Sequence, residues 1–103
     1  MKEESRDYYK KVLLSLLPQT KAEAIPGPEL SRLMHLSYRA IKQIITELRL
    51  EHPICSQETG AGGYWIAENE QDIIEFVKMI ERRRDAYNKT IQIMSHHIFN
   101  EGK

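Results

Sequence analysis

Apolar side chains in the first part of the chain recur with the period of a helix. The buried positions expected there are Tyr9, Val12, Leu13, Leu16 and Leu17. Their i, i+3, i+4, i+7, i+8 spacing predicts a helix over Ser5–Leu17, capped by Ser5 and ended by Pro18. A polar connector then leads to Ile25, where one extended apolar residue can add a short strand.

Two further helical patterns follow, separated by a three-residue turn. Proline and glutamate at positions 28 and 29 suit a first helical turn, which predicts a short helix over Pro28–Met34. After the turn, Ser37 is a suitable N-cap for a helix over Tyr38–Glu51. The residues expected on one face of the first helix are Leu30, Leu33 and Met34. The inward stripe of the second helix comprises Ile41, Ile44, Ile45 and Leu48.

Beyond Pro53 the pattern changes from helical to extended. Two β-prone runs, residues 54–56 and 64–66, flank a segment that contains three glycines, which predicts a hairpin. Tyr64 and Trp65 alternate across the second run, so one should face the core and the other should face outward. Core packing is the expected role of this pair, with base stacking or minor-groove insertion as the alternative. Cys55 is expected to be a small packed hydrophobic residue.

The last pattern is the longest, and it predicts a helix capped by Asn69 that runs to about Ile98. Its apolar positions alternate in steps of three and four, a heptad pattern that suits packing along another helix. The stripe consists of Ile73, Val77, Ile80, Tyr87, Ile91, Met94 and Ile98. Arg84 interrupts it, and a polar residue at such a position can set register or oligomeric state. The wider half before Arg84 should pack on the parent domain. The narrower half should project as a dimerisation surface, formed by Tyr87, Ile91, Met94 and Ile98.

Composition places the chain among single-domain soluble proteins. Of its 103 residues, 41% are hydrophobic and 29% are charged, and no apolar run approaches the ~20 residues of a membrane span. The first residues do not form a signal peptide, and a single cysteine suits a reducing compartment, so a cytoplasmic location is expected. Fifteen basic residues balance fifteen acidic ones, so any affinity for nucleic acid must come from local clustering of charge.

The segment ELSRLMHLSYRAIKQIITELR resembles the helix-turn-helix of bacterial and phage winged-helix regulators. The matching positions are Leu30, Leu33, Leu36, Ser37, Arg39, Ile41, Ile44, Ile45, Leu48 and Arg49. The following residues, EHPICSQETGAGGYWIAENEQDI, are similar to the wing of small DNA-binding proteins from phages, prophages and mobile elements of Gram-positive bacteria. The resemblance implies an α+β, mainly α, fold: a winged helix-turn-helix over residues 1–68 and a C-terminal helix over residues 69–103. His35 occupies the turn position where glycine is usual, and the wing offers Glu58 but no basic residue.

The same resemblance implies binding of double-stranded DNA, with the Tyr38–Glu51 helix in the major groove. The expected DNA-binding residues are Ser37, Tyr38, Arg39, Lys42, Gln43, Thr46 and, in the wing, Thr59. Arginine can pair with guanine and glutamine with adenine, while serine and tyrosine can contact phosphate. The expected role is a homodimeric transcriptional regulator, or a replication or recombination accessory factor, associated with the nucleoid when bound to DNA. The alternative is a protein-interaction module on the same scaffold, which the zero net charge and the acidic wing favour.

Other chemistry has little support in the sequence. No motif for an enzyme, a cofactor or a small-molecule ligand is present. His96 and His97 are adjacent on a helix and face different ways, so no metal site is expected. Arg82–Arg84 point in three directions between Glu81 and Asp85, which favours an ion-paired solvated face over a phosphate contact.

Overall fold

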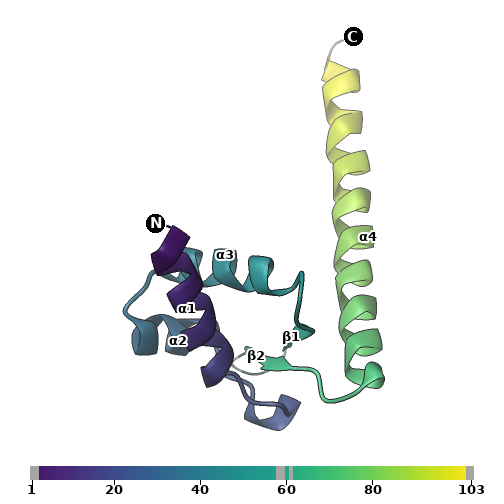
Figure 1. The fold of residues 1–103 in the computed structure, drawn as a ribbon. Helices are drawn as coiled ribbons and strands as arrows, with labels where there is room; N and C mark the ends of the chain where they lie inside the picture. Colours follow the sequence, from purple (N-terminus) through teal and green to yellow (C-terminus); the bar gives the residue numbers. More distant parts are fainter. Residues whose placement is uncertain (1–2, 58–59, 61, 102–103) are drawn as a thin grey trace. The chain divides into compact units, whose positions relative to one another are not determined.

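The computed structural model describes residues 3–57, 60 and 62–101, which form four α-helices, one short 3-10 helix and a two-stranded antiparallel sheet (Figure 1). In chain order these are α1 (Glu3–Leu16), η1 (Lys21–Glu23), α2 (Gly27–Met34), α3 (Tyr38–Leu48), β1 (Ile54–Gln57), β2 (Gly63–Ile66) and α4 (Glu70–Glu101). The expected α+β, mainly α, class is therefore confirmed. Backbone contacts divide the chain into two compact units, residues 1–73 and 74–103.

The core of the first unit lies where α1, α2 and α3 meet. Leu13, Leu30 and Ile41, one from each helix, have no solvent exposure. The core also contains Leu17, Met34, Ile44, Ile45, Leu48 and Ile54. The predicted inward stripe of α3 is thus confirmed. Leu33, which was placed on one face of α2 with Leu30 and Met34, is 43% exposed, because the buried part of that face is centred on Leu30 and Met34.

Helix α3 is shorter than predicted: it ends at Leu48 and not at Glu51. The next residues form tight turns, in which the N–H groups of Leu50 and Glu51 bond to carbonyls three residues earlier, at 3.2 and 3.0 Å. Arg49 Nε then donates to the carbonyl of Ile54 at 2.9 Å, which ties the end of α3 to the start of β1. Burial lowers the pKa of Arg49, and the electrostatic effects of the nearby Tyr64 and Cys55 oppose this shift in part.

The turn between α2 and α3 has the geometry that its sequence indicates. His35 adopts the left-handed conformation that glycine favours, with φ of 54° and ψ of 40°. The backbone N–H of His35 and that of Leu36 both donate to the carbonyl of Ser31. The Ser31 hydroxyl donates in turn to the carbonyl of Leu36, a contact that alanine at this position cannot make. Ser37 caps α3 as predicted, accepting a hydrogen bond from Ala40 N at 3.1 Å.

The hairpin pairs Ile54 with Ile66 at its base and Gln57 with Gly63 near its tip. The predicted extended residue, Ile25, forms a single bridge to Tyr64, with N···O distances of 3.1 and 2.9 Å. This bridge connects the hairpin to the segment before α2. The bridge thereby holds the hairpin to the helical part of the first unit.

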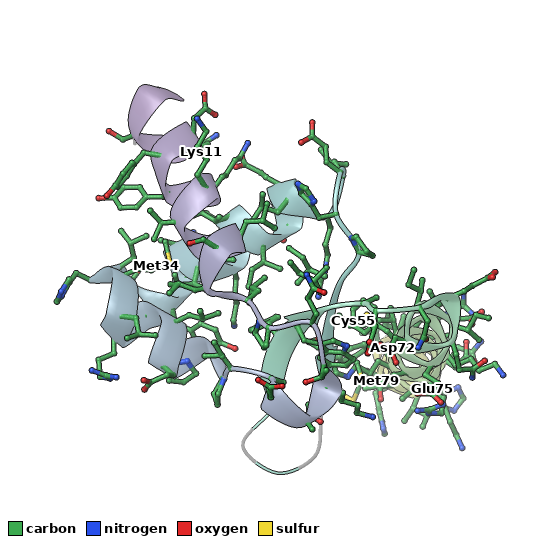
Figure 2. All side chains as sticks on the ribbon, turned by 60° about the horizontal axis from the view of Figure 1, so that its bottom comes forward. Lys11, Met34, Cys55, Asp72, Glu75 and Met79 are labelled. Carbon is green, nitrogen blue, oxygen red and sulfur yellow. The ribbon has the colours of Figure 1, made fainter. Side chains whose placement is uncertain are left out.

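Neither aromatic residue of β2 faces solvent, so the prediction that one of them points outward was wrong. Tyr64 packs against the helical core. Trp65 lies on the opposite face of the hairpin beside its strand partner Cys55, yet it is only 3% exposed. Asp72, from the first turn of α4, covers this face: its carboxylate accepts from Trp65 Nε1 at 3.4 Å, and its backbone carbonyl lies 3.8 Å from Cys55 Sγ (Figure 2). Core packing of the pair is therefore confirmed.

The first turn of α4 is capped as predicted, because Asn69 Oδ1 accepts from Asp72 N at 3.0 Å. Beyond it, α4 continues as one uninterrupted helix of 32 residues to Glu101. At ~1.5 Å per residue this corresponds to roughly 48 Å. No helix among the described residues has the length and apolar character that a bilayer crossing requires.

Candidate nucleic-acid interface

The outward face of α3 carries most of the residues predicted to bind DNA. Arg39, Lys42, Gln43 and Thr46 line a shallow concavity on the first unit, together with Glu47 and with Arg6 of α1. They lie together because α3 is amphipathic: its isoleucines are buried, so the residues between them are turned to the other side of the helix. The structure thus brings four of the seven predicted residues to one surface.

Arg39 and Lys42 supply the positive charge of this surface. Among the described residues, no carboxylate lies within ion-pair distance of either side chain. The Lys42 ammonium lies 4.5 Å from the centre of the Tyr38 ring, a cation–π contact that holds it beside the start of α3. Both charges therefore remain available for an anionic ligand.

A further pair of cations comes from α1 and was missed in the sequence analysis. Arg6 Nη1 lies 2.9 Å from Glu47 Oε1, and Lys10 Nζ lies 3.5 Å from Glu47 Oε2. Glu47 is the acidic residue of the concavity, and these contacts balance its charge. Because Arg6 and Glu47 are 41 positions apart, no local pattern in the sequence could have indicated the contact.

Tyr38, which was predicted only to contact phosphate, also packs against other parts of the first unit. Its ring lies over Gly27 at the start of α2, where an added Cβ would come within 2.1 Å of Tyr38 Cε1. Its hydroxyl is 3.4 Å from the hydroxyl of Tyr64 in the hairpin. Tyr38 nevertheless keeps 38% of its surface exposed, so one side of the ring still faces solvent.

We expect Gly27→Ala to destabilise the protein by about 1–3 kcal/mol, because the new methyl group would overlap the Tyr38 ring. In a Tyr38→Ala background the same substitution should cost much less, since the ring is no longer present. Chemical denaturation of the four variants in this cycle measures the coupling. Equal costs of Gly27→Ala in both backgrounds would contradict the contact.

The two hydroxyl residues at the ends of this face differ in what they can still donate. Ser37 Oγ accepts the capping bond from Ala40 N, so its hydroxyl hydrogen remains available for a phosphate oxygen. Thr46 Oγ1 already donates to the carbonyl of Lys42 at 2.9 Å. A phosphate contact by Thr46 would have to replace that bond, which makes it the weaker of the two candidates.

The predicted wing residue Thr59 lies outside the described residues. Near the tip of the hairpin, Gln57 Nε2 donates to the carbonyl of Gly62 at 3.3 Å. A second shallow concavity lies between η1 and this part of the hairpin, and Lys21 and Pro26 contribute to its lining. Lys21 thus places a cation beside a hairpin whose own sequence has none, a position that the sequence analysis did not single out.

Cys55 is the buried partner of Trp65 in the hairpin and not part of the α3 surface. Burial raises the pKa of the Cys55 thiol, and the nearby charge of Asp72 raises it further. No cluster of three metal-ligating side chains occurs within the part of the chain that the structure describes.

We expect the Cys55 thiol to react slowly with a thiol reagent at neutral pH, since it is both protonated and 1% exposed. Addition of denaturant should give one rapidly labelled thiol per chain, which a colorimetric disulfide reagent measures directly. Rapid stoichiometric labelling of the native protein would contradict the buried position.

The residues predicted to dimerise all lie on α4 and are exposed within a single chain. Tyr87, Ile91, Met94 and Ile98 are 70%, 60%, 58% and 71% exposed. Exposure of four large apolar side chains along one helix is the pattern of a surface that binds a partner. The surface is described in more detail below.

Comparison of the chain with protein families, with curated proteins and with solved structures finds no match.

Proposed function

We propose that this protein binds double-stranded DNA as a winged helix, with α3 inserted in the major groove. The order of elements supports the assignment: three helices are followed by a hairpin, and the hairpin is bridged to the segment before α2. In such a domain the second helix of the helix-turn-helix reads base edges, and the first helix and the hairpin contact the backbone. The wing in this proposal is β1–β2.

The observation that carries the proposal is the positive concavity on the outward face of α3. Arg39 and Lys42 have no acidic partner among the residues that the structure describes, and the charge of Glu47 is balanced by two cations from α1. Arginine and glutamine at positions 39 and 43 can form bidentate contacts to guanine and adenine, respectively. Because the chain has no net charge, its affinity for DNA must come from a local cluster of positive charge, and this concavity is such a cluster.

We also propose that the protein acts as a dimer through α4. A single neutral domain with few phosphate contacts should bind DNA weakly, and two linked domains raise the effective affinity without new contacts. Two copies of α3 would then read two half-sites. Regulation of transcription, or assistance in replication or recombination of a phage or mobile element, is the role that the resemblance implies for such a dimer.

The rival function is a protein-interaction module that uses the same scaffold without DNA. The observation in its favour is that part of the outward α3 face is already used within the chain. Tyr38, at the start of this face, contacts Gly27, Tyr64 and Lys42. The absence of net charge also favours it. The two functions differ in their expected salt dependence, because phosphate contacts weaken steeply with salt and apolar contacts do not.

Fluorescence anisotropy of labelled mixed-sequence duplexes, measured from low to physiological salt, tests the proposal. The expected result is binding at low salt whose logarithm falls linearly with the logarithm of salt concentration. As a matched control, an unrelated labelled acidic polymer replaces the duplex in the same titration. Binding of the duplex but not of the polymer separates shape-dependent DNA binding from simple charge attraction. No binding at low salt would reject DNA binding and leave the protein-interaction module.

A further inference from the structure

We propose that α4 pairs antiparallel with α4 of a second copy of this chain, with Arg84 of each copy packed against Tyr87 of the other. The inference rests on the dimer proposed above and specifies its geometry. It depends on three features of α4: the exposure of its apolar stripe, the spacing of that stripe and the position of its one charged member.

The stripe runs along almost the whole helix. Its members are Ile73, Val77, Ile80, Arg84, Tyr87, Ile91, Met94 and Ile98. The apolar members are between 38% and 71% exposed, and these include Val77 and Ile80 of the half that was expected to pack on the parent domain. Their strict alternation of four- and three-residue steps keeps the stripe facing one partner helix over this length. Packing against a flat protein surface would not require so regular a spacing.

The order of residue types along the stripe is self-complementary when it is read in opposite directions. Antiparallel pairing centred between Arg84 and Tyr87 places Ile73 opposite Ile98 of the second copy. The other apolar layers then pair Val77 with Met94 and Ile80 with Ile91. All eight stripe positions find a partner in this register. A two-fold symmetric dimer needs this kind of self-complementary surface, which argues for a second copy as the occupant.

The centre of this arrangement gives Arg84 a suitable environment. Each guanidinium would lie against the face of Tyr87 of the other copy, where cation–π attraction and stacking favour arginine. Within its own chain, Arg84 Nε and Nη2 both lie 3.2 Å from Asp85 Oδ1. Asp85 can therefore continue to balance the charge while the planar group covers the tyrosine ring.

Parallel pairing in register is less favourable because it places identical positions opposite each other. Arg84 would lie directly opposite Arg84 of the second copy in the middle of an apolar seam, and neither guanidinium would have a tyrosine ring opposite it. In the antiparallel arrangement the two Arg84 residues are instead offset by about 4.5 Å along the helices. The flanking pairs are Arg83 with Thr90 and Glu81 with Asn88, so no flanking pair brings like charges together.

Antiparallel registers shifted by one heptad are also less favourable. A shift in one direction places Arg84 opposite Ile80, and a shift in the other places it opposite Met94. Both shifts leave stripe residues at one end of each helix without a partner. The centred register alone combines full use of the stripe with the Arg84–Tyr87 contact.

Cross-linking of single-cysteine positions tests the geometry in the absence of DNA. Equimolar Ile80→Cys and Ile91→Cys chains are mixed and treated with a short bifunctional maleimide. The antiparallel dimer predicts a covalent dimer in the mixture and little in either variant alone, because two copies of position 80 would be offset by about 16 Å along the helices. The parent chain, whose only thiol is the buried Cys55, is the control for background reaction.

A second pair of variants, Glu81→Cys and Asn88→Cys, leaves every stripe residue in place. The antiparallel dimer predicts that each of these variants is also cross-linked preferentially in the mixture, since residues 81 and 88 flank the same seam. Cross-linking of Ile80→Cys to itself would establish parallel pairing and overturn the proposal. A monomer by sedimentation, or a dimer without cross-links at either pair, would overturn it as well.

These outcomes are independent of DNA binding. Antiparallel cross-links together with a failed anisotropy experiment would reject the DNA-binding function and retain the α4 dimer. Salt-dependent DNA binding by a chain that forms no such cross-links would reject the dimer geometry and retain the function.

Discussion

Replacement of both Arg39 and Lys42 by alanine is expected to reduce DNA affinity by at least about 30-fold, because each side chain contributes on the order of 1–3 kcal/mol as a base or phosphate contact. Both residues lie in the α3 concavity without an acidic partner among the described residues, so they supply most of its usable charge. The slope of log affinity against log salt should also fall by about one for each lost phosphate contact. Anisotropy titration at several salt concentrations measures both effects.

The matched control removes the same amount of charge from other surfaces. Lys11 is exposed on α1 and is not part of the concavity (Figure 2). Lys89 is exposed on α4. Lys11→Ala with Lys89→Ala should therefore leave DNA affinity within a few-fold of the parent. Circular dichroism should show unchanged helicity for both double variants. Equal losses of affinity in the two would indicate that the protein responds to total charge and that α3 is not the docking face.

Substitution of Ile91 and Met94 by aspartate is expected to convert the dimer to a monomer. The two residues are adjacent members of the α4 stripe, and in the proposed pairing they lie opposite Ile80 and Val77 of the second copy. A carboxylate without a partner in an apolar seam costs about 3–5 kcal/mol, which corresponds to a weakening of at least ~100-fold. Sedimentation velocity over a range of concentrations reports the change directly.

Gln92→Asp with His96→Asp provides the control on the same helix. These positions are four residues apart, as i, i+4 neighbours, and fall outside the stripe. The control variant should sediment as the parent does, and both variants should keep their helical content. If the Ile91, Met94 double variant sediments like the parent, α4 does not form the dimer interface.

Local chemistry in the sequence was enough to predict most of the elements. Ser37 and Asn69 cap α3 and α4 as expected, because capping depends on residues three positions apart. The positive φ at His35 agrees with what the resemblance implied, because His35 occupies the turn position where glycine is usual. The end of α3 was placed three residues too late because the helical pattern continues into turns that form before Pro53.

The contacts that shape the candidate interface were not predictable in the same way. Gly27 beneath Tyr38, and Arg6 beside Glu47, depend on the angles at which α1 and α2 pack against α3. No local period encodes these angles. The outward position given to one aromatic residue of β2 was wrong for a related reason. Strand alternation determines the two faces of the hairpin, but it does not show that the first turn of α4 brings Asp72 into contact with Trp65.

Selection of binding sites from a pool of random duplexes tests the central claim most directly. The parent chain and the Arg39→Ala variant are each taken through the same rounds of selection, and the enriched sequences are compared. We expect the parent to enrich a motif with two related half-sites, and we expect a base position within each half-site to lose its preference in the Arg39→Ala variant. Sequences from the parent that remain indistinguishable from the starting pool would contradict sequence-specific DNA recognition by α3.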